Sequence, residues 1–356
     1  MKQTSRKGTA KPRRNRRPPA RAKAVSLALQ GGGSHGAFTW GVLDRLLEDD
    51  RVEIEAISGT SAGAMNAAAL ADGMLRGGRE GARAALARLW EEVARVGRFG
   101  PIQRGPFEVA TGDWNLHDSP SYILFDWMSR FLSPYQFNPL NFNPLMDVLR
   151  AVVDFDNVRR CDQVKLFIAT TSVRTGKIRI FENAELSAEA IMASACLPHL
   201  FQAVEIDGEP FWDGGYMGNP AIYPLIYRCG TRDVVIVQIN PMVRDDTPKT
   251  TPDILDRLNE ISFNSSLMRE MRAIAFVGRL LEENRLDEAR YKRMLIHRID
   301  APEEMAALGV SSKLNAEREF LVHLRDIGRT AAAAWLERNF EALGRRSTVD
   351  ILADYL

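Results

Sequence analysis

Two glycine-rich turns near the start of the chain constrain its fold more than any other feature. The first, at residues 31–36, follows a short apolar run at 25–29. The second, at 59–63, follows the apolar run 54–57. After each turn, apolar or alanine residues recur at helical spacing. Because parallel strands need a helical crossover between them, this pattern predicts an α/β fold with a mostly parallel central sheet.

Further strand and helix signals follow in the second half of the chain. Two short turn sequences, 174–177 and Asp207-Gly208, separate apolar runs and predict two β-hairpins. The expected strands are 166–172, 178–181, 204–206, 211–212, 234–239 and 293–299, and the expected helices are 187–196, 254–281, 314–325 and 329–342. Helices therefore follow strands along most of the chain.

Residues 97–150 differ in composition from the rest. They are rich in Gly, Pro, Asn and aromatic residues, and Phe-Asn-Pro-Leu occurs at 137–140 and again at 142–145. Proline and asparagine exclude a long helix across this repeat. An irregular insertion of this length is typical of a lid, with Phe137, Leu140, Phe142 and Leu145 as its apolar contacts. A loop packed on the body of the domain fits equally well.

Residues 1–23 form a basic tail. They contain ten of the 47 Lys and Arg residues of the chain and no Asp or Glu. Since the tail has almost no apolar residues to bury, we expect it to be disordered. A solvated tail without a partner and peripheral contact with an anionic membrane both fit this composition. Contact with nucleic acid fits too, but no specific nucleic-acid partner is predicted.

The composition excludes several classes of protein. No run approaches the roughly 18 apolar residues that a membrane span needs, and the first apolar run is too short for a signal peptide. We therefore expect a cytoplasmic protein, with membrane contact at its periphery. The cysteines Cys161, Cys196 and Cys229 show no C-x-x-C spacing and are expected to be free thiols. No histidine pair has metal-ligand spacing, so neither metal nor cofactor is predicted.

The second glycine-rich turn contains a G-x-S-x-G motif. Gly59 and Gly63 flank Ser61, and Ala62 begins the following helix. Such a turn exposes the serine hydroxyl at the edge of the sheet, where the free N–H groups of the helix face it. The sequence therefore predicts a nucleophilic serine at position 61.

The first glycine-rich turn has two interpretations. Backbone N–H groups of Gly31, Gly32 and Gly33 can form an anion-binding loop, which would serve as an oxyanion hole beside Ser61. The spacing of Gly31, Gly33 and Gly36 also fits a dinucleotide-binding loop, with Glu53 or Glu55 near the position of the ribose-binding acid. The dinucleotide interpretation leaves the G-x-S-x-G motif unexplained.

A third motif is Asp213-Gly214-Gly215, which follows Phe211-Trp212. A carboxylate at the end of an apolar strand is partly desolvated, and desolvation raises its pKa toward that of a useful base. An aspartate that caps its own turn is the alternative explanation.

Taken in order, the glycine-rich loop, G-x-S-x-G and D-G-G resemble the patatin-like phospholipases. Residues 190–198, Phe201 and Asn219-Pro220 are also similar to the second half of that family. The resemblance covers residues 24–240. It implies a three-layer fold with helices on both faces of the sheet. It also implies that Ser61 is the nucleophile, that Asp213 is its direct base, and that Gly31, Gly32, Gly33 and Ala62 bind the oxyanion.

The resemblance also implies a domain organisation and a substrate class. Residues 24–240 would form the catalytic domain with its insertion, and 241–356 an α-rich extension packed on the same domain. The substrate would be a lipid ester, with phospholipid favoured, cleaved through an acyl-enzyme. Gly36, Gly59, Gly63, Gly214 and Gly215 would support the motifs.

One residue departs from the family, and two other functions stay open. His35 stands where the family usually has Lys or Arg, and is expected to contact a headgroup or shape the loop. An α/β-hydrolase would instead use a Ser-Asp-His triad with His297 or His323, or less plausibly His199, as base. A lipid-binding protein without activity could share the same scaffold.

Overall fold

A computed structural model of the chain describes residues 22–244 and 246–356. The basic tail lies outside these residues, apart from its last two positions. The strands are β1 Lys23–Leu29, β2 Val52–Gly59, β3 Lys165–Ser172, β4 Ile178–Glu182, β5 Val204–Ile206, β6 Glu209–Asp213, β7 Asp233–Val237 and β8 Leu295–Ile299. Each strand predicted from the sequence is present, with its ends shifted by at most a few residues.

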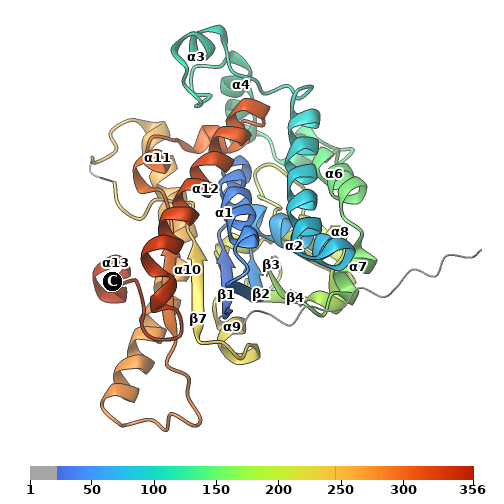
Figure 1. The fold of residues 1–356 in the computed structure, drawn as a ribbon. Helices are drawn as coiled ribbons and strands as arrows, with labels where there is room; N and C mark the ends of the chain where they lie inside the picture. The colour runs from blue at the N-terminus through green and yellow to red at the C-terminus, as the bar shows by residue number, and fades with distance from the viewer. Residues whose placement is uncertain (1–21, 245) are drawn as a thin grey trace, which may run out of the picture.

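The strands form one eight-stranded sheet in the order β5-β6-β3-β2-β1-β7-β8, with β4 also paired to β3 (Figure 1). The pairs that join β3, β2, β1, β7 and β8 are all parallel. The strands β4, β5 and β6 form antiparallel pairs at one side of the sheet. The predicted α/β class with a mostly parallel sheet is confirmed.

Helices cover both faces of the sheet. The α-helices outside the insertion are α1 Gly36–Glu48, α2 Ala62–Gly97, α7 Phe155–Arg160, α8 Ala188–Ser194, α9 Tyr223–Arg228, α10 Thr251–Glu282, α11 Pro302–Ala306, α12 Arg318–Asn339 and α13 Ile351–Tyr355. Short 3-10 turns are η1 Gly33–His35, η2 Asn183–Glu185, η3 Gly214–Tyr216, η4 Val310–Leu314 and η5 Phe340–Ala342.

Successive strand residues point into two separate cores. Leu27 and Leu29 of β1 belong to a cluster that includes residues of α1, α2 and α12. Ala28, between them, belongs to a second cluster with residues of α9, α10 and α13. This alternation is what a sheet buried on both faces requires, and it produces the expected three layers.

The helix α12 corrects the prediction of two helices at 314–325 and 329–342. It runs unbroken from Arg318 to Asn339, although Gly328 lies at its centre. A Cβ atom at Gly328 would lie 2.1 Å from the carbonyl oxygen of Phe38, and one at Gly41 would lie 1.9 Å from that of Arg325. The two glycines therefore let α1 and α12 pack with their backbones in contact, and Gly328 does not end a helix.

The insertion is more regular than expected. It contains α3 Pro106–Thr111, α4 Pro120–Phe131, α5 Pro134–Phe137 and α6 Pro144–Val152. Each of these helices begins with a proline. Proline is tolerated in the first helical turn, where its missing N–H would have no partner. The prolines thus exclude one long helix, as expected, but they start four short ones.

The residues after 240 continue the fold of the preceding part. Strand β8 pairs with β7 along five residues, so the sheet crosses the boundary expected at 240. The helix α12 packs on α1 at the opposite end of the sequence (Figure 1). In the described part of the chain, no helix is long and apolar enough to cross a membrane.

Candidate active site

The turns after β1, β2 and β6 meet at one edge of the sheet. Gly59 of β2 pairs with Ile168 of β3, and Asp213 of β6 pairs with Thr170, two residues further along β3. This register brings the end of β6 beside the turn that follows β2. The sheet therefore places Ser61 and Asp213 at the same edge.

Ser61 adopts a strained conformation at the start of α2. Its φ of 53° and ψ of −121° are unusual for a residue with a side chain, and its side chain does not cap the helix. The Ser61 N–H donates a hydrogen bond of 2.9 Å to the Ser194 hydroxyl. Ser194 comes from α8, so a buried side chain distant in sequence holds the turn in place. No sequence pattern indicates this role of Ser194.

Close contacts explain the glycines around Ser61. A Cβ atom at Gly31 would lie 2.7 Å from the Cβ atom of Ser61, and one at Gly63 would lie 2.5 Å from the Leu29 carbonyl oxygen. The remaining motif glycines are crowded in the same way, with contacts of 2.1–2.8 Å, at Gly36, Gly59, Gly214 and Gly215. A side chain at Gly31, Gly36 or Gly63 would push the two glycine-rich turns apart, whereas one at Gly214 or Gly215 would collide with Ala169 of β3 or Phe263 of α10.

Asp213 is buried, with 1% of its surface exposed. Its Oδ1 accepts a hydrogen bond of 2.7 Å from the Gly215 N–H. Burial raises the pKa of Asp213 to about 7, against the lowering effects of that bond, the Ser61 hydroxyl and the Lys313 charge. The hydroxyl of Ser61 is thus a neighbour of the carboxylate, yet Oδ2 makes no hydrogen bond of standard geometry within the described residues. Asp213 is therefore a carboxylate with a spare acceptor and a pKa near neutrality.

The N–H groups of the glycine-rich loop are not equivalent. The Gly31 N–H donates to Asn219 Oδ1 at 2.7 Å, so it is already occupied. In the part of the chain that the structure describes, the N–H groups of Gly32, Gly33 and Ala62 have no acceptor. Gly31 thus belongs to the framework of the loop, and three other N–H groups stay available for an anion.

Comparison of the whole sequence with protein families gives one match. A model described as patatin-like phospholipase matches residues 27–226. The chain belongs to this family. At the level of the family, this makes it a lipid acyl hydrolase. A search of curated proteins found no match.

Solved structures of similar architecture include VipD from Legionella pneumophila, with 16% identity and a TM-score of 0.42 over 89% of this chain and 67% of that one. The ExoU–SpcU complex of Pseudomonas aeruginosa gives 15% identity and a TM-score of 0.36, over 90% of this chain and 52% of that one. This patatin-like chain therefore spans about half the length of ExoU.

His35 is part of the loop framework in this patatin-like chain. It is 3% exposed, and its Nε2 lies 2.7 Å from the Ser312 hydroxyl. Burial, together with the Lys313 charge, lowers the pKa of His35 well below its ordinary value, so the ring is neutral. The loop role fits these contacts, whereas the expected headgroup contact does not, because the ring is covered.

The other histidines are engaged elsewhere. His297 is fully buried in β8 between Asp233 Oδ1 at 2.9 Å and the Thr348 hydroxyl at 3.1 Å. His323 stacks on Trp114 with ring centroids 5.9 Å apart, and His199 is exposed. None of these histidines forms a hydrogen bond with Ser61 or Asp213 in the described residues. The geometry therefore provides no Ser-Asp-His triad.

The dinucleotide interpretation also lacks its acidic residue. Both carboxylate oxygens of Glu55 accept backbone N–H groups, from Gly230 at 2.6 Å and from Thr231 at 2.8 Å. Glu53 is exposed on the strand. Among the described residues, no cluster of His, Cys, Asp or Glu could hold a metal ion.

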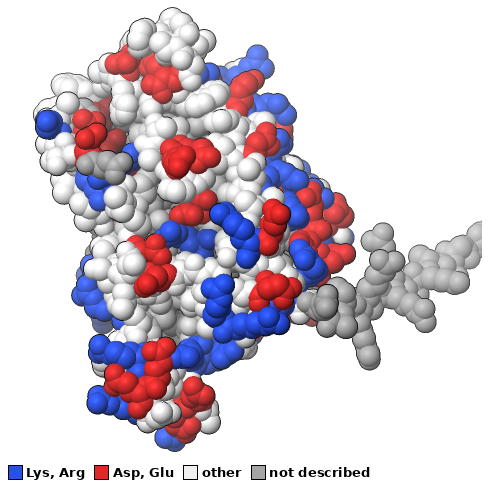
Figure 2. Space-filling view, turned by 60° about the vertical axis from the view of Figure 1, so that its left-hand side comes forward, with Lys and Arg blue, Asp and Glu red and all other residues white. Residues whose placement is uncertain are grey.

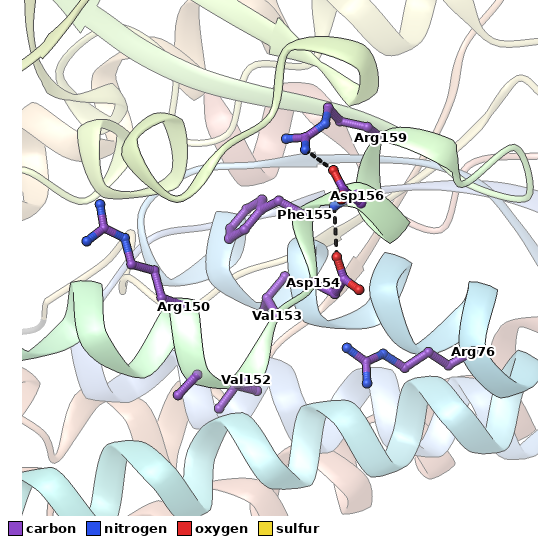
Figure 3. Close-up of a pocket in the computed structure, with 9 residues that line it drawn as sticks. Arg76, Arg150, Val152, Val153, Asp154, Phe155, Asp156 and Arg159 are labelled. Atoms are coloured by element: carbon purple, nitrogen blue, oxygen red, sulfur yellow. Dashed lines mark hydrogen bonds and ion pairs between the residues drawn. The ribbon is translucent and has the colours of Figure 1, made fainter.

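One surface cavity lies away from Ser61 and Asp213, neither of which lines it. It has a volume of about 400 Å³ and is lined by Arg76, Val152–Phe155 and two further arginines, Arg150 and Arg159 (Figure 3). Each arginine is already paired with a carboxylate, of Asp72, Glu189 and Asp156 respectively. Ser61 itself is only 9% exposed.

Proposed function

We propose that this protein is a serine acyl hydrolase that cleaves carboxylic esters in lipids, with Ser61 as nucleophile and Asp213 as its direct base. The observation that carries this proposal is the pairing of a strained serine with a buried carboxylate of raised pKa. A carboxylate with a pKa near 7 is a far better base than an ordinary aspartate, and about half of it is ionised at neutral pH.

The reaction would proceed in two steps. The Ser61 oxygen attacks the ester carbonyl carbon while Asp213 Oδ2 accepts the hydroxyl proton. The resulting oxyanion receives hydrogen bonds from the N–H groups of Gly32, Gly33 and Ala62, at the positive end of α2. Collapse of this intermediate releases the alcohol, which takes the proton from Asp213, and leaves an acyl group on Ser61. Water, deprotonated by Asp213, then attacks the acyl carbonyl carbon. The bond to the Ser61 oxygen breaks, Asp213 returns the proton to that oxygen, and the carboxylic acid leaves.

An exposed apolar surface supports a lipid substrate. On α4, Ile123, Leu124, Trp127 and Phe131 are 53–68% exposed. On the first turns of α10, Ile254, Leu255, Leu258 and Ile261 are 40–54% exposed. We name these eight residues the apolar rim. The two helices are linked through residues 309–310. The Val310 N–H donates to Asp256 of α10, and a Cβ atom at Gly309 would lie 2.7 Å from Nε2 of His117, whose ring packs edge-on against Tyr122 of α4.

The apolar rim fits contact with aggregated lipid. Figure 2 shows mainly uncharged residues at the upper tip of the molecule, where α3 and α4 lie, with acidic and basic side chains beside them. Exposed apolar patches of this kind mark interaction surfaces, and Trp and Phe favour the membrane–water interface. The insertion also contacts the residues directly before β5, the strand that precedes β6 and Asp213. The Gln202 side chain donates a hydrogen bond to the Asn138 carbonyl oxygen, and the Ala203 N–H donates one to the Tyr135 hydroxyl. Movement of the insertion on lipid would therefore open a path toward Ser61.

The expected lid residues divide into two pairs. Leu140 is 91% exposed and Phe142 68% exposed, so both are available to a lipid surface. Phe137 instead packs edge-on against Phe125, and Leu145 packs against the main core. We propose that the tip of the insertion, with Leu140 and Phe142, acts with the apolar rim.

The first test is covalent labelling and ester hydrolysis. Wild type should react with a fluorophosphonate probe and hydrolyse a short p-nitrophenyl ester, and Ser61→Ala should lose both. Ser129→Ala is the matched control, since the Ser129 hydroxyl contacts only the Asp126 carbonyl in α4. If folded wild type neither labels nor hydrolyses phospholipid vesicles, the protein is a lipid-binding scaffold without activity. Loss of activity in His297→Asn or His323→Asn would instead support a triad.

The lipid preference needs a separate test. Trp127→Ser with Phe131→Ser should lower hydrolysis of phosphatidylcholine vesicles about tenfold, because two large apolar contacts are lost. Hydrolysis of a monomeric short ester should stay unchanged. Leu352→Ser, at an equally exposed residue of α13, is the control. An equal loss on both substrates would show that these side chains have no specific role at the lipid surface.

A further inference from the structure

Asn219 is a buried side chain to which the proposed reaction gives no role. It belongs to the Asn219-Pro220 pair of the sequence, and none of its surface is exposed. Its Oδ1 accepts a hydrogen bond from the Gly31 N–H at 2.7 Å, and its carbonyl oxygen accepts one from Gln30 Nε2 at 3.3 Å. Asn219 therefore holds the two residues with which the chain leaves β1 and enters the glycine-rich loop.

The glycine-rich loop depends on such contacts, because its glycines have no side chains that could anchor it. The Gly31 carbonyl oxygen accepts a hydrogen bond from Asn240 Nδ2 at 2.9 Å, and Asn240 Oδ1 accepts one from Lys313 Nζ at 2.9 Å. The Lys313 carbonyl oxygen would lie 2.5 Å from a Cβ atom at Gly33, so η4 packs directly on the loop. Both polar groups of the Gly31 backbone are therefore held by asparagine side chains.

The residue before Asn219 holds the serine turn. The Thr60 hydroxyl donates a hydrogen bond of 2.6 Å to the Gly218 carbonyl oxygen. The Gly218 N–H donates one of 2.8 Å to the carbonyl oxygen of Gly214, which directly follows Asp213. Gly218 and Asn219 thus bind the serine turn, the turn after Asp213 and the glycine-rich loop.

Helix α10 holds Asn219 in its turn. The Asn219 N–H donates a hydrogen bond of 3.1 Å to the Ser266 hydroxyl, and Gln30 Nε2 donates one of 3.2 Å to Asn264 Oδ1. Both side chains of α10 are buried. Since α10 lies beyond the residues that match the family, the anchor of the loop includes residues outside the matched region.

The position of Gly31 bears on the chemistry, because Gly31 lies against the nucleophile. A Cβ atom at Gly31 would lie 2.7 Å from the Cβ atom of Ser61. The next two residues, Gly32 and Gly33, have N–H groups without an acceptor in the described part of the chain. A displacement of Gly31 would move these donors relative to Ser61. An error of about 1 Å in such an arrangement can cost about a hundredfold in rate.

We propose that Asn219 is a positioning residue of the hydrolase, which holds Gly31 so that the next two N–H groups of the loop face the oxyanion. The proposal rests on the function proposed above and adds to it the side chain that fixes these donors beside the nucleophile. In the described residues, Asn219 Nδ2 makes no hydrogen bond, so the role of the side chain depends on Oδ1. Because Asn219 is fully buried, it acts through Gly31 and does not contact the substrate.

The experiment measures kcat and KM of Asn219→Ala for a monomeric p-nitrophenyl ester. Loss of an interaction made only in the transition state lowers kcat and kcat/KM equally. The kcat should therefore fall about thirtyfold, while KM stays within about twofold of wild type. Asn183→Ala is the matched control, because Asn183 Oδ1 accepts the Leu166 N–H, also at 2.7 Å, near the start of β3. It should be destabilised in urea, as Asn219→Ala is, but should keep both kinetic constants.

A second variant covers the case in which Asn219→Ala does not fold. Ser266→Ala removes the acceptor of the Asn219 N–H and should lower kcat about threefold with KM unchanged. Ser265→Ala is its control, because the Ser265 hydroxyl donates to the Ser262 carbonyl oxygen within α10. If only Ser266→Ala folds, an unchanged kcat in that variant overturns the inference.

The outcomes separate this inference from the proposed function. An unchanged kcat in folded Asn219→Ala, or an equal loss in Asn183→Ala, would overturn the inference, while Ser61-dependent hydrolysis would still stand. A raised KM with unchanged kcat would also overturn it, since Asn219 would then act on substrate binding. Hydrolysis that persists in Ser61→Ala would overturn the proposed function, and with it the need for an oxyanion loop beside Ser61.

Discussion

The matched region, residues 27–226, and the C-terminal region, residues 241–356, contribute to the same site in different ways. The matched region provides Ser61, Asp213 and the loop glycines, each within a short motif. The C-terminal region provides β8, α12 and Lys313, none of which belongs to a motif. Its contributions depend on contacts with residues far away in the sequence. The proposed catalytic groups thus lie in short sequence motifs, whereas the residues that hold them in place come from distant parts of the sequence.

The largest expected effect comes from a comparison of two buried aspartates. Asp213 belongs to the matched region, and Asp233 binds residues of the C-terminal region. Asp213→Asn should lower kcat/KM about a thousandfold or more, because it removes the base that accepts the Ser61 proton. Asp233→Asn should leave activity nearly unchanged but lower the free energy of unfolding by about 1–3 kcal/mol. It weakens the bonds of Asp233 to His297 and to the Gly344 N–H. Ester hydrolysis and urea denaturation measure the two effects.

Two results would contradict this comparison of Asp213 with Asp233. If Asp233→Asn removes activity in a folded protein, the contact of β7 with the C-terminal region takes part in the chemistry directly. If Asp213→Asn stays active, another group is the base, and the proposed dyad is wrong.

The second prediction concerns the contact between α1 and α12. Gly328→Ala should lower the free energy of unfolding by about 1–3 kcal/mol, because the new methyl group would collide with the Phe38 carbonyl oxygen. Gly278→Ala in α10 is the matched control, since no atom lies within 4 Å of its added Cβ. There the better helix propensity of alanine should stabilise the protein by up to about 1 kcal/mol. The same sign for both substitutions, in chemical denaturation, would contradict the contact between the two helices.

The smallest expected effect concerns Asp213, the proposed base in the matched region, and is the pH dependence that it gives to activity and stability. Burial holds the Asp213 pKa at about 7, so kcat/KM should fall about tenfold for each pH unit below that value. The raised pKa also means that the folded protein keeps a proton which the unfolded chain releases between about pH 4 and 7. Stability therefore decreases through that window as pH rises, and Asp213→Asn should be more stable than wild type at pH 8. A pH–rate profile and thermal unfolding at pH 5 and pH 8 test the two statements.

The sequence allowed prediction of the parts of the fold with regular local patterns. Apolar runs followed by glycines identified β1 and β2, and the motifs placed Ser61 and Asp213 at the turns where they are found. The catalytic roles of these two residues remain predictions. The division of α12 at residues 325–329 was wrong, because Gly328 serves a helix contact that no local pattern reveals.

Other features of the site could not be predicted for similar reasons. The occupied N–H of Gly31 depends on Asn219, nearly two hundred residues away. Ser194 holds the Ser61 turn from a helix whose sequence shows only ordinary helical periodicity. Lys313 is one basic residue among many until η4 is folded against the glycine-rich loop. In each case, the contact joins residues that lie far apart in the sequence, and no local pattern pairs them.

The position of β7 and β8 has a consequence for how the chain can be divided. Both strands follow residue 226, where the family match ends, and β7 covers one side of β1. A fragment that stopped there would leave the N–H and C=O groups along one side of β1 without partners. Open strand edges of this kind pair readily with other chains and lead to aggregation. The boundary of the family match is thus not a boundary for folding, because β7 and β8 cover a strand edge that would otherwise be open to pairing with other chains.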